Sequence, residues 1–115
     1  MPHHALLLTD RLCDLTEMAL QAYTKFEKAT VFAATKAIHE DFRQAALPSH
    51  AMEKLDGICH AILAAVEYEP AEGRTNPQCI VKARTEISAL RELLRGQEAW
   101  MQKERLDGRS PVTLQ

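Results

Sequence analysis

Apolar residues recur every three or four positions from residue 5 to residue 45, which predicts one long amphipathic helix, either continuous or broken once. The first part of this apolar seam runs through Leu8, Leu12, Leu15, Ala19, Ala22, Phe26, Ala29 and Ala33. The seam then shifts by one position, as a stutter or a kink would produce, and continues through Ala34, Ile38, Phe42 and Ala45. Because the adjacent β-branched residues Thr30 and Val31 have low helix propensity, we expect the bend or break near residues 30–33.

Two further helices follow. Pro48 ends the first element, because the residue before a proline avoids the helical region, and Ser49 is the expected N-cap of the next helix. Gly57 lies inside that helix, where we expect a neighbouring backbone to come close. The loop at 69–75 precedes Asn76 and Pro77, a typical helix start. The two seams comprise Met52, Leu55, Cys59, Ile62 and Val66, and then Ile80, Ala83, Ile87, Leu90, Leu94 and Met101.

The predicted fold is all-α: an antiparallel bundle of three main helices, or of four if the first helix is split near residues 30–33. The last helix should run to about Leu106 and stop at Gly108. Residues 1–108 would form a single bundle domain, followed by a disordered tail at 109–115. The residues expected to be buried are Leu12, Leu15, Phe26, Leu55, Ile62, Ile87, Leu90 and Leu94.

Composition supports a folded chain and shows an uneven distribution of charge. The sequence is 46% hydrophobic and 26% charged, which excludes a disordered protein. Residues 1–73 carry six Lys/Arg and eleven Asp/Glu, a balance of −5, whereas residues 74–115 carry eight and five, a balance of +3. Helices of opposite charge could attract each other within the fold or across a dimer; the alternative is a binding face for an acidic partner.

Cysteine content and hydropathy predict a cytoplasmic protein. The three cysteines, Cys13, Cys59 and Cys79, are odd in number and widely spaced, which is typical of a reducing compartment. No apolar run is long enough to span a membrane, and the first residues lack the basic start of a signal peptide.

Motifs for catalysis and for cofactors or metals are missing from the sequence. None of His39, His50 and His60 has a glutamate three residues before it or a histidine four residues after it, so neither helical metal motif is present. Cys79, in the first turn of a predicted helix, is the most reactive thiol by position, but the pattern places no histidine beside it. The sequence therefore predicts neither an enzyme nor a bound cofactor or metal.

An arginine stripe makes nucleic-acid binding the alternative function. Arg84, Arg91 and Arg95 follow one another at steps of seven and four, so they share one side of the last helix, with Ser88 between them. Such a row can contact phosphates of nucleic acid or another anionic partner. The simpler interpretation is a solvated helix face, because no dense basic cluster accompanies the stripe.

Helix-face binding to another protein, or to a second copy, is the function that the sequence favours most. Apolar residues outside the main seams include Met18, Tyr23, Phe32, Leu93 and Trp100, and aromatic residues and methionine are enriched at interfaces. Such a module would act as an adaptor, a chaperone or an inhibitor. The candidate interface residues are Phe32, Ile38, Phe42, Leu93 and Trp100.

Helix lengths add the expectation of a homodimer. An unbroken first helix would span about 60 Å and exceed both partners, leaving part of its apolar stripe bare. The bare part would include Phe32, Ile38 and Phe42 at one end, or Leu6, Leu7 and Leu8 at the other. A second subunit could cover it. In the alternative to a dimer, residues 33–47 fold back as a separate helix, and the same apolar residues are buried within one chain.

Overall fold

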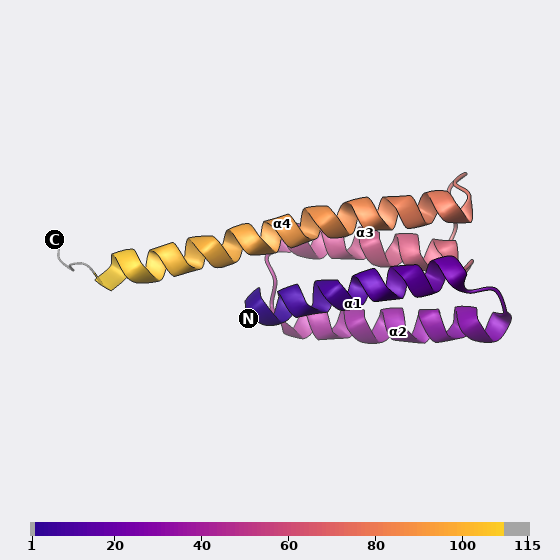
Figure 1. Cartoon of the computed structure of the whole chain (residues 1–115), viewed down its shortest axis with the longest axis horizontal. Coiled ribbons are helices and arrows are strands. Elements are labelled where there is room, and N and C mark those ends of the chain that lie inside the picture. Colours follow the sequence, from indigo (N-terminus) through magenta and orange to yellow (C-terminus); the bar gives the residue numbers. More distant parts are fainter. Residues whose placement is uncertain (1, 110–115) are drawn as a thin grey trace.

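Four helices form the protein in the computed structural model, which describes the backbone of residues 2–109 and the side chains of residues 5–96. They are α1 (Pro2–Gln21), α2 (Lys25–Gln44), α3 (Ser49–Ala65) and α4 (Asn76–Arg109). Each runs antiparallel to the one before it (Figure 1). No strand occurs between residues 2 and 109. The all-α prediction is confirmed, and the count of three main helices is wrong by one.

The helices pack in the order of the chain around a square. α1 contacts α2 on one side and α4 on the other, and α3 contacts both α2 and α4. α2 and α4 therefore occupy opposite corners. No helix within the described part of the chain is long and apolar enough to cross a membrane.

The first predicted helix is divided at residues 22–24, and the expected position of the break, near residues 30–33, is wrong. Thr24 Oγ1 accepts a hydrogen bond from the Glu27 N–H at 3.1 Å, and Glu27 Oε1 accepts from the N–H groups of Thr24 and Tyr23 at 2.9 and 2.8 Å. This reciprocal capping box starts a new helix at Lys25. Residues 30–33 lie inside α2, where packing outweighs the low propensity of the β-branched pair.

The displaced break explains one wrong burial prediction. Phe26 lies in the first turn of α2, and its side chain is 69% exposed. The apolar seam of α1 ends at Ala19, with Ala22 in the turn that follows, and α2 has a seam of its own that starts at Val31. The other predicted core residues are confirmed: Leu12, Leu15, Leu55, Ile62, Ile87, Leu90 and Leu94 are all buried.

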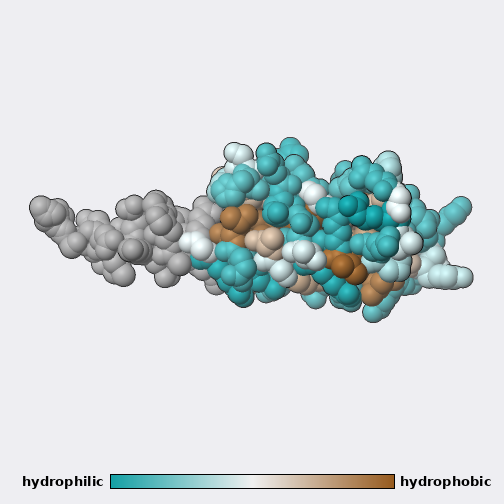
Figure 2. Space-filling model, turned by 90° about the horizontal axis from the view of Figure 1, so that it is seen from above, coloured by the Kyte–Doolittle hydropathy of each residue, from teal (hydrophilic) through white to brown (hydrophobic). Residues whose placement is uncertain are grey.

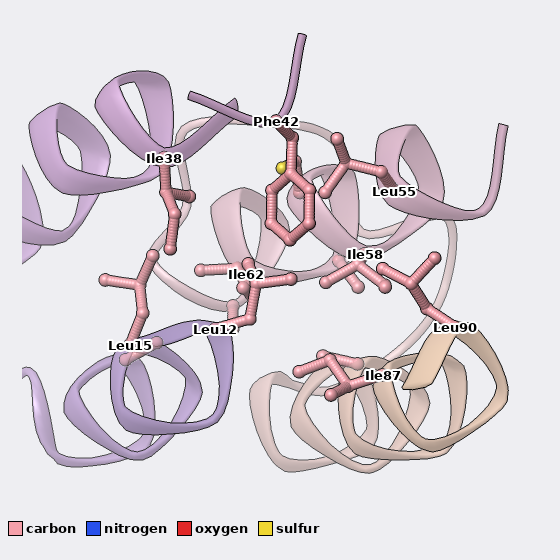
Figure 3. Packing of buried hydrophobic residues seen from close by; sticks show 14 of the residues in the cluster. Leu12, Leu15, Ile38, Phe42, Leu55, Ile58, Ile62, Ile87 and Leu90 are labelled. Atoms are coloured by element: carbon pink, nitrogen blue, oxygen red, sulfur yellow. The ribbon is translucent and has the colours of Figure 1, made fainter. Parts of the chain in front are cut away.

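A single buried cluster joins all four helices. Figure 3 shows Phe42 of α2 pointing into the centre, toward Ile62 and Ile58 of α3, with Ile87 and Leu90 of α4 facing them. Ile38 and Phe42 are 6% and 0% exposed, so the chain folds back and covers them itself. The stripe expected to be bare at these residues is therefore covered within one chain, although the segment that folds back is 25–44 and not the predicted 33–47.

Buried polar groups in this core are satisfied locally. The hydroxyls of Thr9, Thr16 and Thr35 donate to the carbonyl oxygens of Leu6, Leu12 and Val31 at 2.6 to 2.7 Å. These bonds make the threonines compatible with helical core positions. Gly57 does not serve the expected close approach, because a Cβ placed there would meet no atom within 4 Å.

Helix α4 is far longer than its neighbours. Its 34 residues span about 51 Å, and its C-terminal part extends past the ends of the other helices (Figure 1). The molecule accordingly measures 62 × 23 × 19 Å. The helix ends at Arg109 and includes Gly108, close to the predicted end at Leu106. The tail prediction concerns residues that, apart from Arg109, lie outside those described.

Candidate interaction surface

Two residues of the arginine stripe pair with acidic side chains of α1. Arg84 donates hydrogen bonds from Nε and Nη2 to the Glu17 carboxylate, at distances of 2.7 to 2.9 Å. Arg91 Nη2 donates to Asp10 Oδ1 at 2.9 Å, and its Nε donates to Thr9 Oγ1 at 3.4 Å. The basic part of the chain thus meets the acidic part within one molecule, across the α1–α4 boundary.

The third arginine of the stripe has a different partner. Arg95 Nη1 contacts Glu92 Oε2 of its own helix at 3.3 Å, and both side chains are largely exposed. An anionic partner binding the whole stripe would have to compete with three carboxylates: Glu17, Asp10 and Glu92. The contacts of Arg84 and Arg91 favour the interpretation of the charge asymmetry in which helices of opposite charge attract each other within the fold.

The predicted interface residues do not form one surface. Ile38 and Phe42 are core residues. Phe32 is half-buried and stacks on Tyr68 with ring centroids 4.5 Å apart, while Lys36 Nζ lies 5.6 Å from the Phe32 centroid. Leu93 is half-buried at the other end of the bundle, and the side chain of Trp100 lies outside the described residues.

An apolar groove lies instead between α1 and α2. One half is lined by Leu15, Met18, Ala34, Ala37 and Ile38, with the charged residues Arg11, Asp14 and Asp41. The other half is lined by Met18, Gln21, Ala22, Phe26, Glu27, Thr30 and Val31. Met18 borders both hollows, and we call the two together the α1–α2 groove.

Large apolar side chains are exposed along this groove. Met18 is 46% exposed and Phe26 is 69% exposed, and Tyr23, in the turn beside them, is 87% exposed. The α2 wall includes three small residues, Thr30, Ala34 and Ala37, which leave room for another backbone to approach between the larger side chains of that wall. An extended apolar surface with small residues on one wall is typical of a site for a helix of another protein.

Sequence reasoning identified part of this surface. The apolar pattern places Met18 and Tyr23 off the seam, and its prediction that Phe26 lies in the core is wrong. The signal that could have identified it is Thr24 followed three residues later by Glu27, because this spacing marks a helix start. With that break in place, Phe26 leaves the seam of α1.

Acidic side chains outnumber basic ones at the rim of the groove. Asp14, Asp41 and Glu27 line it, and Arg11 is the single basic lining residue among the described side chains. Arg11 Nη1 lies 3.9 Å from Asp41 Oδ2, a distance at which both exposed groups stay accessible to a third charge. Backbone hydrogen bonds from Thr24 and Tyr23 lower the pKa of Glu27, so this carboxylate is ionised at neutral pH.

A second, polar hollow lies between α2, α3 and the connection that follows α3. His39 Nε2 is 2.8 Å from Asp56 Oδ1, and His60 Nδ1 is 3.0 Å from Glu69 Oε1. Cys59 lines the same hollow, and burial together with the Asp56 charge raises the pKa of its thiol to about 12. The thiol is therefore protonated at neutral pH and a poor nucleophile.

Metal ligands and the other thiols give no alternative site within the described residues. Residues 5–96 contain no group of three His, Cys, Asp or Glu side chains arranged to hold a metal ion. Cys79, the most reactive thiol by sequence position, is only 2% exposed. Cys13 is half-buried, with its Sγ 3.3 Å from Arg91 Nη2.

Comparison with known proteins gives no relative: no family model, curated protein or solved structure matches this chain.

Proposed function

We propose that this protein is a small, non-catalytic interaction module whose α1–α2 groove binds an amphipathic helix of another protein. The observation that carries the proposal is the groove itself, where Met18 and Phe26 expose large apolar surfaces beside the small residues Ala34 and Ala37. A helix with apolar residues at spacings of three and four would bury these side chains.

The rim determines the chemistry of the partner. Because Asp14, Asp41 and Glu27 outnumber Arg11, the partner helix should carry Lys or Arg beside its apolar stripe. These charges would set the orientation and the rate of association, whereas the apolar stripe would supply most of the affinity.

The cytoplasm is the compartment that fits this module best. All three cysteines are free, and Cys59 and Cys79 are buried where no partner thiol reaches them. Thiols kept unpaired in this way are typical of proteins in a reducing environment.

Selection from a library of displayed helical peptides tests the proposal. We expect enriched peptides to carry an apolar stripe flanked by Lys or Arg, with dissociation constants on the order of micromolar. Ala34→Arg places a long cationic side chain in the groove and should weaken their binding by at least about tenfold. Thr85→Arg is the matched control, because it adds the same side chain at an exposed position of α4.

Two outcomes would refute the groove as the binding site. In one, no peptide is enriched; in the other, Ala34→Arg binds the enriched peptides as tightly as the wild type does. A gel shift with sub-micromolar affinity at physiological salt, weakened by Arg84→Gln, would support nucleic-acid binding through the stripe instead.

A further inference from the structure

Close packing within its own chain does not require glycine at position 96. It lies inside α4, where glycine is the least favourable residue after proline. A Cβ placed on it would meet no atom within 4 Å, and the residue is exposed. The fold of one chain would therefore accept a side chain at this position.

A hollow borders Gly96 at the end of the bundle. It is lined by Pro48, His50 and Ala51 at the start of α3 and by Glu92, Leu93 and Gly96 of α4. Seen from the side of α3 and α4, hydrophobic surface lies near this end of the bundle (Figure 2). The half-buried Leu93 and the absence of a side chain at Gly96 make this surface apolar and allow a close approach.

Helix α4 continues straight past this hollow. Residues 97–109 prolong it by about 20 Å, beyond the ends of the other three helices (Figure 1). The apolar spacing of the bundle also continues in the sequence, where Met101 follows Leu94 by seven residues. An isolated helix of this length is marginally stable in water, so packing against a partner would stabilise it.

We infer that two copies of this chain associate end to end, with their α4 helices crossing antiparallel next to Gly96. In this two-fold arrangement, residues 97–109 of each copy lie in the hollow of the other, so that both hollows are filled by the same contact. Residues 97–109 contain three basic and three acidic residues, so net charge does not oppose their pairing. Glycine at position 96 allows the two helix backbones to come close.

The interface differs from the α1–α2 groove and does not depend on it. It uses the end of the bundle at Pro48 and Gly96, whereas the groove runs along Leu15 and Ala34. The helical segment 97–109 that each copy contributes is about 20 Å long, so the interface is small. We expect a dissociation constant for the dimer on the order of 10 micromolar.

Sedimentation equilibrium of the full chain tests the dimer from about 1 to about 100 micromolar. The mass should rise from 12.9 kDa toward twice that value for the wild type. Gly96→Leu should weaken association by at least about tenfold, because the added side chain holds the helices apart. Gly57→Leu is the matched control: this glycine also lies in a helix with open space at its Cβ, but away from the hollow, and its dimer should match the wild type.

Thermal melting shows whether the variants fold. Gly96→Ala adds only the Cβ, for which the single chain has room, so it should melt no lower than the wild type while dimerising more weakly. A wild type that stays at 12.9 kDa at the highest concentration would overturn the inference, as would Gly96 variants that dimerise as tightly as the wild type. Ala34→Arg should leave the dimer intact, which separates this result from the test of the groove.

Discussion

Helix α1 has two flanks with different chemistry. Toward α4, its carboxylates form close ion pairs, Glu17 with Arg84 at 2.7 Å and Asp10 with Arg91 at 2.9 Å. The hollow on that flank is lined by the charged residues Asp14, Glu17 and Arg84, together with Cys13, Ile87 and Ser88. Toward α2, the single ion pair among the side chains that the structure describes is Arg11 with Asp41 at 3.9 Å, and the lining is mainly apolar.

The difference shows how the charge asymmetry of the sequence is used. Opposite charges on α1 and α4 meet each other, so the α4 flank has little unsatisfied surface to offer a partner. The α2 flank combines exposed Met18 and Phe26 with an acidic rim, which is the combination that a basic amphipathic helix can satisfy.

The largest contrast should come from two phenylalanines on the same helix. Phe42 is fully buried in the core, and Phe42→Ala should cost about 3–5 kcal/mol of unfolding free energy through the cavity it leaves. Phe26→Ala removes a side chain that is 69% exposed and should change stability by less than about 0.5 kcal/mol. Urea denaturation measures both; equal losses would show that Phe26 belongs to the core.

Loss of the cap at the break between α1 and α2 should have the next largest effect on stability. Thr24→Ala removes the hydroxyl that caps α2 and should cost about 0.5–2 kcal/mol. Thr24→Ser keeps the hydroxyl and is the matched control. If both variants melt at the wild-type temperature, the capping box does not determine where α2 begins.

Double-mutant cycles compare the ion pairs on the two flanks of α1. The bidentate pair of Glu17 and Arg84 is half-exposed, and its coupling should be about 0.5–1 kcal/mol at low salt. The pair of Arg11 and Asp41 should couple by less than about 0.3 kcal/mol. A stronger coupling for the second pair would reverse the comparison.

The smallest expected effect is on the stability of the fold at acidic pH. The pKa of Glu67 is lowered by hydrogen bonds from Asn76 and Lys28, and that of Glu27 is lowered by backbone N–H groups. A carboxylate whose pKa is lower in the folded chain than in the unfolded chain stabilises the fold. This contribution is fully present above the pKa of the unfolded chain, near 4.3, and it is lost as the pH falls through the pKa of the folded chain. Stability should therefore fall on acidification below about pH 4. The doubly substituted Glu27→Gln, Glu67→Gln chain should show a shallower fall, and an unchanged slope would contradict the assignment.

Periodicity predicted the helical class and most of the core, because buried positions such as Leu12, Leu55 and Leu90 must repeat with the helix. It fails at Phe26 because the spacing of apolar residues continues across a turn by coincidence, and this spacing does not reflect the Thr24–Glu27 cap. The groove itself could not be predicted, since it depends on which flank of α1 meets α4 and which meets α2. The pairing of Arg84 with Glu17 spans 67 positions and likewise follows from the packing of the helices.

Photo-crosslinking in the native host tests the binding function of the groove most directly. A photoreactive residue is placed at Met18 or at Ala37 in the groove, and at Thr85 on α4 as the control. The account predicts a discrete crosslinked product with a second kind of protein from both groove positions, and none from Thr85. It would be contradicted by the same product at Thr85, by no product from the groove, or by groove crosslinks solely to further copies of this chain.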